Sequence, residues 1–404
     1  MALSMFYPSV SGMEAYSHAM STVSTNIANV NTIGYKKTET LFYTMLGSNP
    51  VVKGDNSGLN SSRTDISGVG THDRTHVTAQ GVISATGKAY DVAINGTGNA
   101  FFMVNDEFGN TYYTRAGSFT TRTVDGETYL ISPNGYRVQG FVANEDGTFS
   151  SGTSDIKINP DETIPSNPTS KIEIIANVGA NEENNSYALT VYGPGNDGRN
   201  VSLTFSKDPE KANTWIVSAE IEGNSTIVGG GEVQFDDKGN IITPKSLDFT
   251  VNWSEEDGGG SNNVTIDISK MTQYAGENYI TNISQDGYPS GNLEKTYFDE
   301  NGVLTAVYSN KQTKALAKLA LVGFEAPENM ENVSGTMFKP NKYSGDSYFL
   351  TDDGMIVSGA VESSTANVEE DFSKMIIIQR AYSVNASSFT TNNEMLQTAV
   401  DLKS

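Results

Sequence analysis

Cysteine is absent from this 404-residue sequence, and histidine occurs only three times. Disulfide bonds, thiol nucleophiles and thiolate metal sites are therefore excluded. No run approaches the roughly 18 apolar residues of a membrane-spanning helix, because the nearest candidate, 315–324, contains Lys318. Basic residues are scarce too: 26 Lys and Arg against 48 Asp and Glu give a net charge of −22. We expect no nucleic-acid partner and no membrane insertion.

The N-terminal segment carries no Lys or Arg before Lys36 and lacks the apolar stretch of a secretory signal. We therefore expect no cleaved signal peptide, which fits a cytosolic protein or export by another route. At about 150 residues per domain, the length predicts two or three domains.

Helical patterns occur at both ends of the chain. Between Pro8 and about Asn31, apolar residues recur at helical steps, at Val10, Met13, Met20, Val23, Ile27 and Val30. Pro8 suits a first helical turn, and Gly34 suits a position just past the helix end.

The C-terminal pattern is more regular, and Asn367 with Glu370 forms a candidate capping box at its start. Steps of four and three alternate through Val368, Phe372, Met375, Gln379, Tyr382, Ala386, Phe389, Asn393, Leu396 and Val400. This seven-residue repeat predicts a coiled-coil seam. We predict that it pairs with the N-terminal helix, forming a stem that joins the chain ends. The polar seam members Gln379 and Asn393 are either tolerated defects or register-fixing contacts.

Between the two helical segments, the amino-acid composition changes twice. Residues 47–70 are rich in Asn, Ser, Gly and Asp, so 41–71 are expected to form an extended arm or linker. From about 72 to 358 the chain is β-rich, which predicts antiparallel sheets. A prolyl stretch with Pro160 and Pro165 is a candidate boundary. Nine Asn-Gly or Asp-Gly pairs mark hairpin turns, among them Asp125-Gly126, Asn134-Gly135, Asp146-Gly147, Asn301-Gly302 and Asp353-Gly354.

No segment carries a strong catalytic or metal-binding pattern. His72 and His76 have the spacing of a helical zinc pair, but their neighbours favour a strand, which would separate them by about 13 Å. Residues 193–198 match a dinucleotide fingerprint yet lead into no helical pattern, so a turn is the better explanation. Residues 236–239 and 299–302 resemble parts of a calcium loop and are better explained as hairpin turns. Among 48 acidic residues, paired carboxylates for glycoside hydrolysis stay open as an alternative to a solvated acidic surface.

The segment Asn26-Ile-Ala-Asn-Val-Asn-Thr-Ile-Gly-Tyr-Lys36 closely resembles the N-terminal signature of bacterial flagellar rod and hook proteins. At the other end, 361–364, 375–385 and 393–397 are similar to the C-terminal helix of the same family. Four segments between them resemble the family's inner β domain: 80–87, 91–96, 114–119 and 138–141.

Two features favour the hook proteins within this family: the length of the chain and the segment that returns from the outer insertion to the inner domain. Residues 145–284 look like a large outer insertion, and 308–310 with 319–324 resemble the return into the inner domain; Lys311 stands where the hook pattern usually has glycine. The implied fold is multidomain and mainly β, with terminal α-helices paired as a coiled-coil stem. Its parts are a helical assembly domain (1–40 and 361–404), an arm (41–71), an inner β domain (72–144 and 285–360) and an outer β domain inserted in it (145–284).

The resemblance implies a structural subunit of the flagellar hook, whose copies form a curved, flexible tube that transmits motor torque from rod to filament as a universal joint. It implies an extracellular place in the flagellum, reached through the flagellar type III export apparatus. Implied partners are other copies and the rod, hook-cap and hook–filament junction proteins; no enzyme activity, cofactor or metal is implied. Its self-assembly residues correspond to Asn26, Ile27, Ala28, Asn29, Asn31, Thr32, Gly34, Tyr35, Lys36, Phe372, Met375, Ile376, Gln379, Arg380, Ala381, Tyr382, Asn385, Phe389 and Leu396.

Three alternatives stay open at this point. Asn26, Asn29 and Asn31 act either through side-chain hydrogen bonds in the assembled tube or as ordinary helix-end residues. The chain could instead be a distal rod protein of the same family. A secreted β-rich adhesin or hydrolase, from a different class, would give discrete particles with a ligand pocket rather than polymers.

The charge distribution predicts how salt affects assembly. Residues 1–40 have two Lys and two Glu, and 361–404 have three basic and six acidic residues, so 41–360 carry −19 of the total −22. Stacked β domains therefore repel, and about 0.15 M salt screens exposed charges beyond about 8 Å. We expect polymerisation to speed up along a sodium chloride series followed by turbidity. Assembly that weakens steadily with salt would show that attractive ion pairs dominate.

Overall fold

The computed structural model describes residues 2–46, 66–96, 98–144, 146–195, 198–255, 258–350 and 355–402. The chain divides into two units: one comprises 1–159, 296–305 and 315–404, and the other comprises 160–295 and 306–314. It therefore passes between the units four times. The second unit begins within the predicted prolyl boundary and ends its first segment at 295, whereas the sequence places the inserted domain at 145–284.

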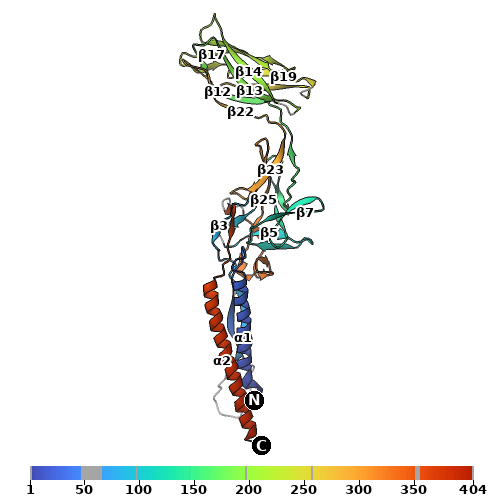
Figure 1. Ribbon diagram of the computed structural model, residues 1–404, viewed down its shortest axis with the longest axis vertical. Helices are drawn as coiled ribbons and strands as arrows, with labels where there is room; N and C mark the ends of the chain where they lie inside the picture. Colours follow the sequence, from blue (N-terminus) through green and yellow to red (C-terminus); the bar gives the residue numbers. More distant parts are fainter. Residues whose placement is uncertain are drawn as a thin grey trace, which may run out of the picture. The chain divides into compact units, whose positions relative to one another are not determined.

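Helices α1 (Ala2–Ala28) and α2 (Val368–Asp401) lie side by side in the first unit (Figure 1). The rings of Phe6 and Phe389 are 5.1 Å apart, and Ser9 Oγ donates to Ser388 Oγ at 3.4 Å. The predicted pairing of the chain ends is therefore confirmed. No helix in the described part of the chain is long and apolar enough to cross a membrane.

Only one of the two helices begins where the sequence predicts. Asn367 Oδ1 accepts hydrogen bonds from the main-chain N–H groups of Glu369 and Glu370, so α2 begins where predicted. The Glu370 carboxylate pairs with lysines rather than completing the capping box. The expectation that Pro8 opens α1 is wrong, because the helix begins at Ala2. Pro8 lies inside α1, past its first turn, where its missing N–H leaves one main-chain hydrogen bond unformed.

The buried face of α1 consists mainly of small residues. The predicted apolar members other than Val23 are only half-buried; the buried positions are Ser9, Ser11, Gly12, Ala15, Ala19, Thr22, Val23 and Asn26. A Cβ atom added at Gly12 would lie 2.6 Å from Asn385 Oδ1, so the two helices approach closely at this glycine. Small side chains are needed because α1 is covered by two partners.

The second partner of α1 is an antiparallel ribbon of β1 (Thr38–Leu46) and β2 (Ile66–Thr75). Thr40 Oγ1 donates to Thr22 Oγ1 at 2.9 Å, and the rings of Tyr16 and Phe42 are 5.2 Å apart. The predicted arm at 41–71 is therefore wrong for its described ends, which form strands. That prediction rests on the polar composition of residues 47–65, which lie outside the described residues.

The first unit also contains a network of short strands. Strand β5 pairs with β6, β9 and β26, while β3–β31 and β4–β30 form two small ladders. The strands are β3 (Ile83–Ala85), β4 (Val92–Ile94), β5 (Ala100–Asn105), β6 (Thr111–Thr114), β7 (Thr120–Val124), β8 (Glu127–Ile131), β9 (Arg137–Ala143), β10 (Phe149–Asp155), β26 (Leu321–Gly323), β27 (Glu331–Asn332), β28 (Met337–Lys339), β29 (Tyr348–Phe349), β30 (Ile356–Ser358) and β31 (Ala360–Glu362). A 3₁₀ turn, η2, spans Pro327–Asn329.

Four of the predicted glycine turns are confirmed. Gly126, Gly135, Gly147 and Gly302 have φ values from 71° to 84°, which glycine adopts at little cost. They connect β7 to β8, β8 to β9, β9 to β10, and β23 to β24. The pair at 353–354 lies outside the described residues.

Three strands contain points at which the chain passes between the units: β23 (Gly291–Phe298), β24 (Val303–Tyr308) and β25 (Thr313–Leu319). In the sheet order β24 lies between β23 and β25. The turn after β24 holds Lys311 at a φ of 65°. This left-handed conformation explains why the hook pattern has glycine at the position.

The second unit is a sandwich of two sheets. One sheet has the order β13-β14-β15-β17-β18; the other has β16-β19-β20-β12, with β21 and β22 also on β12. Alternate side chains of both sheets fill a core that includes Trp215, Phe205 and Phe249. The strands are β11 (Thr163–Ile164), β12 (Lys171–Gly179), β13 (Asn184–Tyr192), β14 (Gly198–Lys207), β15 (Thr214–Ile221), β16 (Thr226–Gly229), β17 (Gly231–Phe235), β18 (Ile241–Thr243), β19 (Ser246–Asn252), β20 (Ser261–Asp267), β21 (Thr272–Tyr274) and β22 (Tyr279–Gln285).

The expectation of purely antiparallel pairing is wrong in this unit. Strand β12 pairs in parallel with β20 and with β21, while β22 is antiparallel to it. Parallel partners must be far apart in sequence, so local turn signals do not reveal them.

A buried charge cluster lies where the chain leaves α1 and approaches α2. Glu362 Oε1 accepts hydrogen bonds from Lys36 Nζ at 2.6 Å and from the main-chain N–H of Gly81 at 2.7 Å. Arg115 Nη1 lies 3.5 Å from Glu362 Oε2, and Lys36 also donates to the carbonyl of Ala79. The side chains of all three charged residues are at most 1% exposed.

The cluster depends on one close backbone approach. Gly34 has a φ of 70°, its N–H donates to the Glu362 carbonyl at 2.8 Å, and an added Cβ would lie 2.5 Å from the main-chain nitrogen of Ala116. Burial lowers the pKa of the Lys36 ammonium, and the charge of Glu362 opposes that shift. Glu362 is therefore the group that compensates the buried charges.

We predict that Glu362→Gln lowers the free energy of unfolding of the first unit by about 3–5 kcal/mol, because two buried cations lose their carboxylate. Urea unfolding followed by the helical circular-dichroism signal reports this unit, since both helices belong to it. Fluorescence of Trp215 and Trp253, which lie in the second unit, is an internal control.

Glu127→Gln is the matched control, because Glu127 is half-exposed and pairs with Lys157 at the surface. Its expected cost is below about 1 kcal/mol. Equal effects of the two substitutions on the helical transition would contradict a structural role for the buried cluster.

Candidate functional site

Only part of the predicted seam of α2 faces α1. Phe372, Tyr382 and Val400 are 50%, 44% and 61% exposed, and Gln379 and Asn393 are also exposed. The main row toward α1 is a different one, with Asp371 buried and Ile378, Ala381 and Asn385 half-buried, followed by Ser388 against Ser9. The predicted seam is therefore only partly the intrachain interface, since one of its members, Phe389, packs against Phe6 of α1. Small and polar contacts such as Ser9–Ser388 make up other parts of that interface, so much of the apolar repeat stays open to solvent.

A second apolar row on α2 has no counterpart in the sequence prediction. Ile377 and Val384 are seven residues apart and are 66% and 69% exposed; Met395 and Leu402, also seven apart, are 59% and 84% exposed. We call Ile377, Val384, Met395 and Leu402 the aliphatic row. Large apolar side chains this exposed on one helix mark an interaction surface.

Ion pairs fasten the first turns of α2 to the segment after α1. Lys37 Nζ lies 3.0 Å from Glu370 and 2.9 Å from Asp371, and Lys374 Nζ lies 2.9 Å from Glu39 and 3.0 Å from Glu370. Hydrogen bonds from Lys37 and Lys374 lower the pKa of the Glu370 carboxyl, and a hydrogen bond from Lys374 lowers the pKa of Glu39. These carboxylates are therefore ionised near neutral pH.

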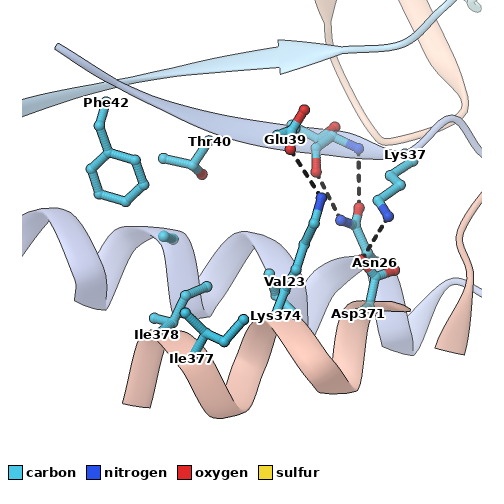
Figure 2. Close-up of a pocket in the computed structure, with 12 residues that line it drawn as sticks. Val23, Asn26, Lys37, Glu39, Thr40, Phe42, Asp371, Lys374, Ile377 and Ile378 are labelled. Carbon is cyan, nitrogen blue, oxygen red and sulfur yellow. Dashed lines mark hydrogen bonds and ion pairs between the residues drawn. The ribbon is translucent and has the colours of Figure 1, made fainter. Parts of the chain in front are cut away.

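A cavity of about 180 Å³ lies beside these ion pairs, between α1, β1 and α2 (Figure 2). Ala19 and Val23 of α1 line it, together with Phe42 of β1 and Ile377 and Ile378 of α2. Its other end is lined by Asn26, Lys37, Thr38, Glu39, Thr40, Asp371 and Lys374. Figure 2 shows the ion pairs at one end and Phe42 with the two isoleucines at the other.

Asn26 is fully engaged inside the subunit. It is 1% exposed; its Nδ2 donates to the carbonyl of Thr38 at 2.7 Å, and its Oδ1 accepts from Tyr35 Oη at 2.9 Å and Thr38 N at 3.1 Å. A neighbouring molecule cannot reach this side chain. Neither of the two explanations left open by the sequence describes it.

The other N-terminal signature residues divide into bonded and open positions. Asn29 Nδ2 donates to the carbonyl of Thr25 and its Oδ1 accepts from Thr32 Oγ1, which is helix-end chemistry. Gly34, Tyr35 and Lys36 are buried, Ile27 is half-buried, and Ala28 and Asn31 are exposed.

The C-terminal signature residues lie on both sides of α2. Phe372, Ile376, Gln379, Arg380, Tyr382 and Phe389 are exposed, whereas Met375, Ala381, Asn385 and Leu396 are half-buried. The exposed set and the aliphatic row leave apolar atoms on much of the helix surface.

The structure also shows what the weak sequence motifs form. His72 lies in β2 and His76 just after it, and His76 is 3.4 Å from Glu39; no metal-binding cluster occurs among the described residues. The side chains of Asp236 and Asp299 accept main-chain N–H bonds of their own turns, so the hairpin explanation is confirmed. The described part of 193–198 links β13 to β14, as predicted.

Sequence reasoning gave no role to the groups that shape the site. Glu362 and Arg115 lie in segments 361–364 and 114–119, where only a resemblance was noted. Lys37 and Phe42 carried no signal of their own, and Asp371 was expected only to place negative charge near the start of α2, because ion pairs and cavity walls arise from residues distant in the chain.

We predict that Asn26→Ala lowers the free energy of unfolding by about 2–3 kcal/mol, since it leaves buried partners at Tyr35 and Thr38 unpaired. Alanine's better helix propensity offsets less than about 0.7 kcal/mol. Asn29→Ala, at the helix end, is the control and is expected to cost under about 1 kcal/mol. Urea transitions measured by circular dichroism check this, and a stabilised Asn26→Ala would contradict it.

Family models match four parts of the chain. "Flagella basal body rod protein" matches 6–36, "Flagellar hook protein FlgE/F/G D1 domain" matches 93–175, "Flagellar basal body protein FlaE D2 domain" matches 158–288, and "Flagellar basal body rod FlgEFG protein C-terminal" matches 357–402.

Full-length relatives agree with these matches. The flagellar hook protein FlgE of Rhizobium meliloti strain 1021 is 30% identical over 98% of this chain and 97% of its own length. That of Brucella suis biovar 1 is 29% identical over 99% and 98%, and that of Escherichia coli K12 is 24% identical over 98% and 100%. The crystal structure of Helicobacter pylori flagellar hook protein FlgE2 shares the fold, with a TM-score of 0.51 and 14% identity over 70% of this chain and 99% of that one. The chain therefore belongs to the flagellar hook protein FlgE family.

Proposed function

We propose that this chain is the repeating structural subunit of the bacterial flagellar hook. Many copies assemble into a curved, flexible helical tube that transmits torque from the rod to the filament. The observation that carries this is the apolar surface of α2, which the subunit's own fold leaves uncovered. Membership of the hook protein family supports copies of the same chain as what covers it.

The signature residues take two proposed roles. The exposed members of α2, Phe372, Ile376, Gln379, Arg380 and Tyr382, contact neighbouring copies. Met375, Ala381, Asn385, Phe389 and Leu396 hold α2 against α1. The buried N-terminal members, Asn26, Gly34, Tyr35 and Lys36, act on assembly indirectly, because they fix where the stem leaves the β region. Ile27, Ala28, Asn29, Asn31 and Thr32 complete that junction.

The domain roles follow from this proposal. The terminal helices form the assembly domain, the β strands of the first unit form the inner domain, and the second unit is the outer domain inserted in it. No catalytic role is proposed, since no cluster among the residues that the structure describes suggests one. The subunit is exported by the flagellar type III apparatus and functions outside the cell. Its further partners are the rod, hook-cap and hook–filament junction proteins.

We predict that Ile376→Gln abolishes or strongly slows polymerisation without destabilising the subunit. Ile376 is 52% exposed, and glutamine is a good helix former, so the subunit's own fold loses little. An interface that buries this side chain loses roughly 1.5–3 kcal/mol per contact. Sedimentation and electron microscopy of the purified protein under assembly conditions measure the effect.

The matched control is Ile242→Gln in the second unit, because Ile242 is also 52% exposed. This variant is expected to polymerise normally. Wild-type protein that stays in discrete particles under all salt conditions would contradict the proposed function. Equal impairment by both substitutions would show that α2 is not the assembly surface.

A further inference from the structure

Strand β13 is an edge strand of the second unit that lacks the usual protections against pairing with another chain. It borders the sheet β13-β14-β15-β17-β18, extends over nine residues and pairs with β14 in unbroken register. Its sequence contains no charged residue, proline or glycine. Native proteins protect long edges with charges, proline, bulges or shortness, because an open row of N–H and C=O groups pairs readily with another strand.

The other border strands of the sandwich are protected. Strands β16, β18 and β21 have at most four residues each. The longer β22 pairs with β12 across a register shift between Ile175 and Ala176, so its edge is not regular. Among the described strands of this sandwich, β13 is therefore the edge best suited to pairing over several residues.

The main-chain groups of β13 that point away from β14 belong to its even-numbered residues. In an antiparallel ladder, the N–H and C=O of one residue point to the same side, and the side alternates along the strand. Tyr192 identifies the outward residues, because its N–H donates to Thr169 Oγ1 and its C=O accepts from the Thr169 N–H, each at 2.9 Å. Thr169 precedes β12, which lies in the other sheet.

The outward row is closed at two points and open between them. Tyr192 closes one end, and at the other end the Ser186 C=O accepts from Asn278 Nδ2 at 3.4 Å. Between these contacts, no residue that the structure describes bonds the outward main-chain groups of Ala188 and Thr190. The strand therefore presents two N–H and two C=O groups to a partner.

Charge indicates that the partner is a second β13. The second unit has 21 Asp and Glu against 10 Lys and Arg, a net of −11, so two copies of it repel. An identical copy that approaches through β13 brings no charge to the contact. The outward-facing side chains of Ser186, Ala188 and Thr190 are also small, so they leave room for another backbone.

We propose that β13 pairs with β13 of a second copy, antiparallel, about a two-fold axis at Leu189. Ala188 of each copy then lies opposite Thr190 of the other, and the free N–H and C=O groups form four reciprocal hydrogen bonds. The two five-stranded sheets become one continuous sheet.

This contact is isologous, whereas a helical polymer is built from heterologous contacts between copies that point the same way. The dimer is therefore a state of the free subunit and not a repeating contact of the tube. It does not depend on the proposed function.

Cysteine cross-linking tests the pairing, because the chain has no cysteine of its own. Equal amounts of an Ala188→Cys chain and a Thr190→Cys chain are mixed in salt too low for polymers to form, and then oxidised. Opposed residues of a hydrogen-bonded pair have Cα atoms about 5.5 Å apart, within the range of about 4.4–6.8 Å that a disulfide needs. We expect covalent dimers that contain one chain of each kind, identified by mass spectrometry.

Each chain oxidised alone is the first control. Ala188 of one copy lies diagonally from Ala188 of the other, about 7–8 Å away, so the mixture should give at least about tenfold more dimer than either chain alone. A mixture that gives no more dimer than the Ala188→Cys chain alone would overturn the proposed register.

Ser202→Cys mixed with Thr190→Cys is the matched control. Ser202 lies opposite Ala188 on β14 and is also exposed, but it is one strand, about 4.8 Å, farther from the partner. This mixture should stay monomeric. Cross-linking equal to that of the Ala188→Cys mixture would show random collision and overturn the pairing.

A second measurement uses no cysteine. Ala188→Glu places a charge on the open edge and is expected to raise the dissociation constant of the dimer at least about tenfold in sedimentation velocity. Ser202→Glu changes the net charge equally, one strand inward, and should dimerise nearly as the wild type does. Unchanged fluorescence of Trp215 and Trp253 checks that both variants keep the sandwich. Wild-type protein that stays monomeric at every concentration below polymerisation would overturn the dimer and leave the proposed function standing.

Discussion

One buried carboxylate fixes the junction between the two ends of this chain. Glu362 receives Lys36 from the segment after α1, the main chain at Gly81, and Arg115 from the β region. Three segments far apart in sequence therefore meet at a single charged group that water cannot screen. Because α2 begins only six residues later and α1 ends eight residues before Lys36, this group sets where both helices leave the β strands.

The two sides of α2 differ in how their side chains pack. Toward α1, contacts such as that of Gly12 with Asn385 are small or polar and allow close approach of the two helices, and the ring pair of Phe6 and Phe389 is an aromatic exception. Away from α1, large apolar side chains stay exposed. A subunit that buried all its apolar surface internally would have nothing left for its neighbours, so the incomplete burial of α2 is consistent with assembly.

The sequence predicted the elements better than their partners. The α2 start at Asn367 and four glycine turns are local properties, and the pairing of the chain ends followed because the sequence has only two long helical patterns; all were predicted. The face of α2 that meets α1 was not, because periodicity locates an apolar stripe without saying what covers it. The β1–β2 ribbon was missed for a similar reason: its strands are separated by polar residues. For the site, the signature supplied Asn26 and Lys36, but their partners, Thr38 and Glu362, were visible only once the chain was folded.

The four passages of the chain between the two units also have a mechanical consequence. Three of them fall within β23, β24 and β25, neighbouring strands of one sheet, and the fourth is at Pro160. A force that pulls the units apart is shared by four covalent connections instead of the two that a simple insertion would provide.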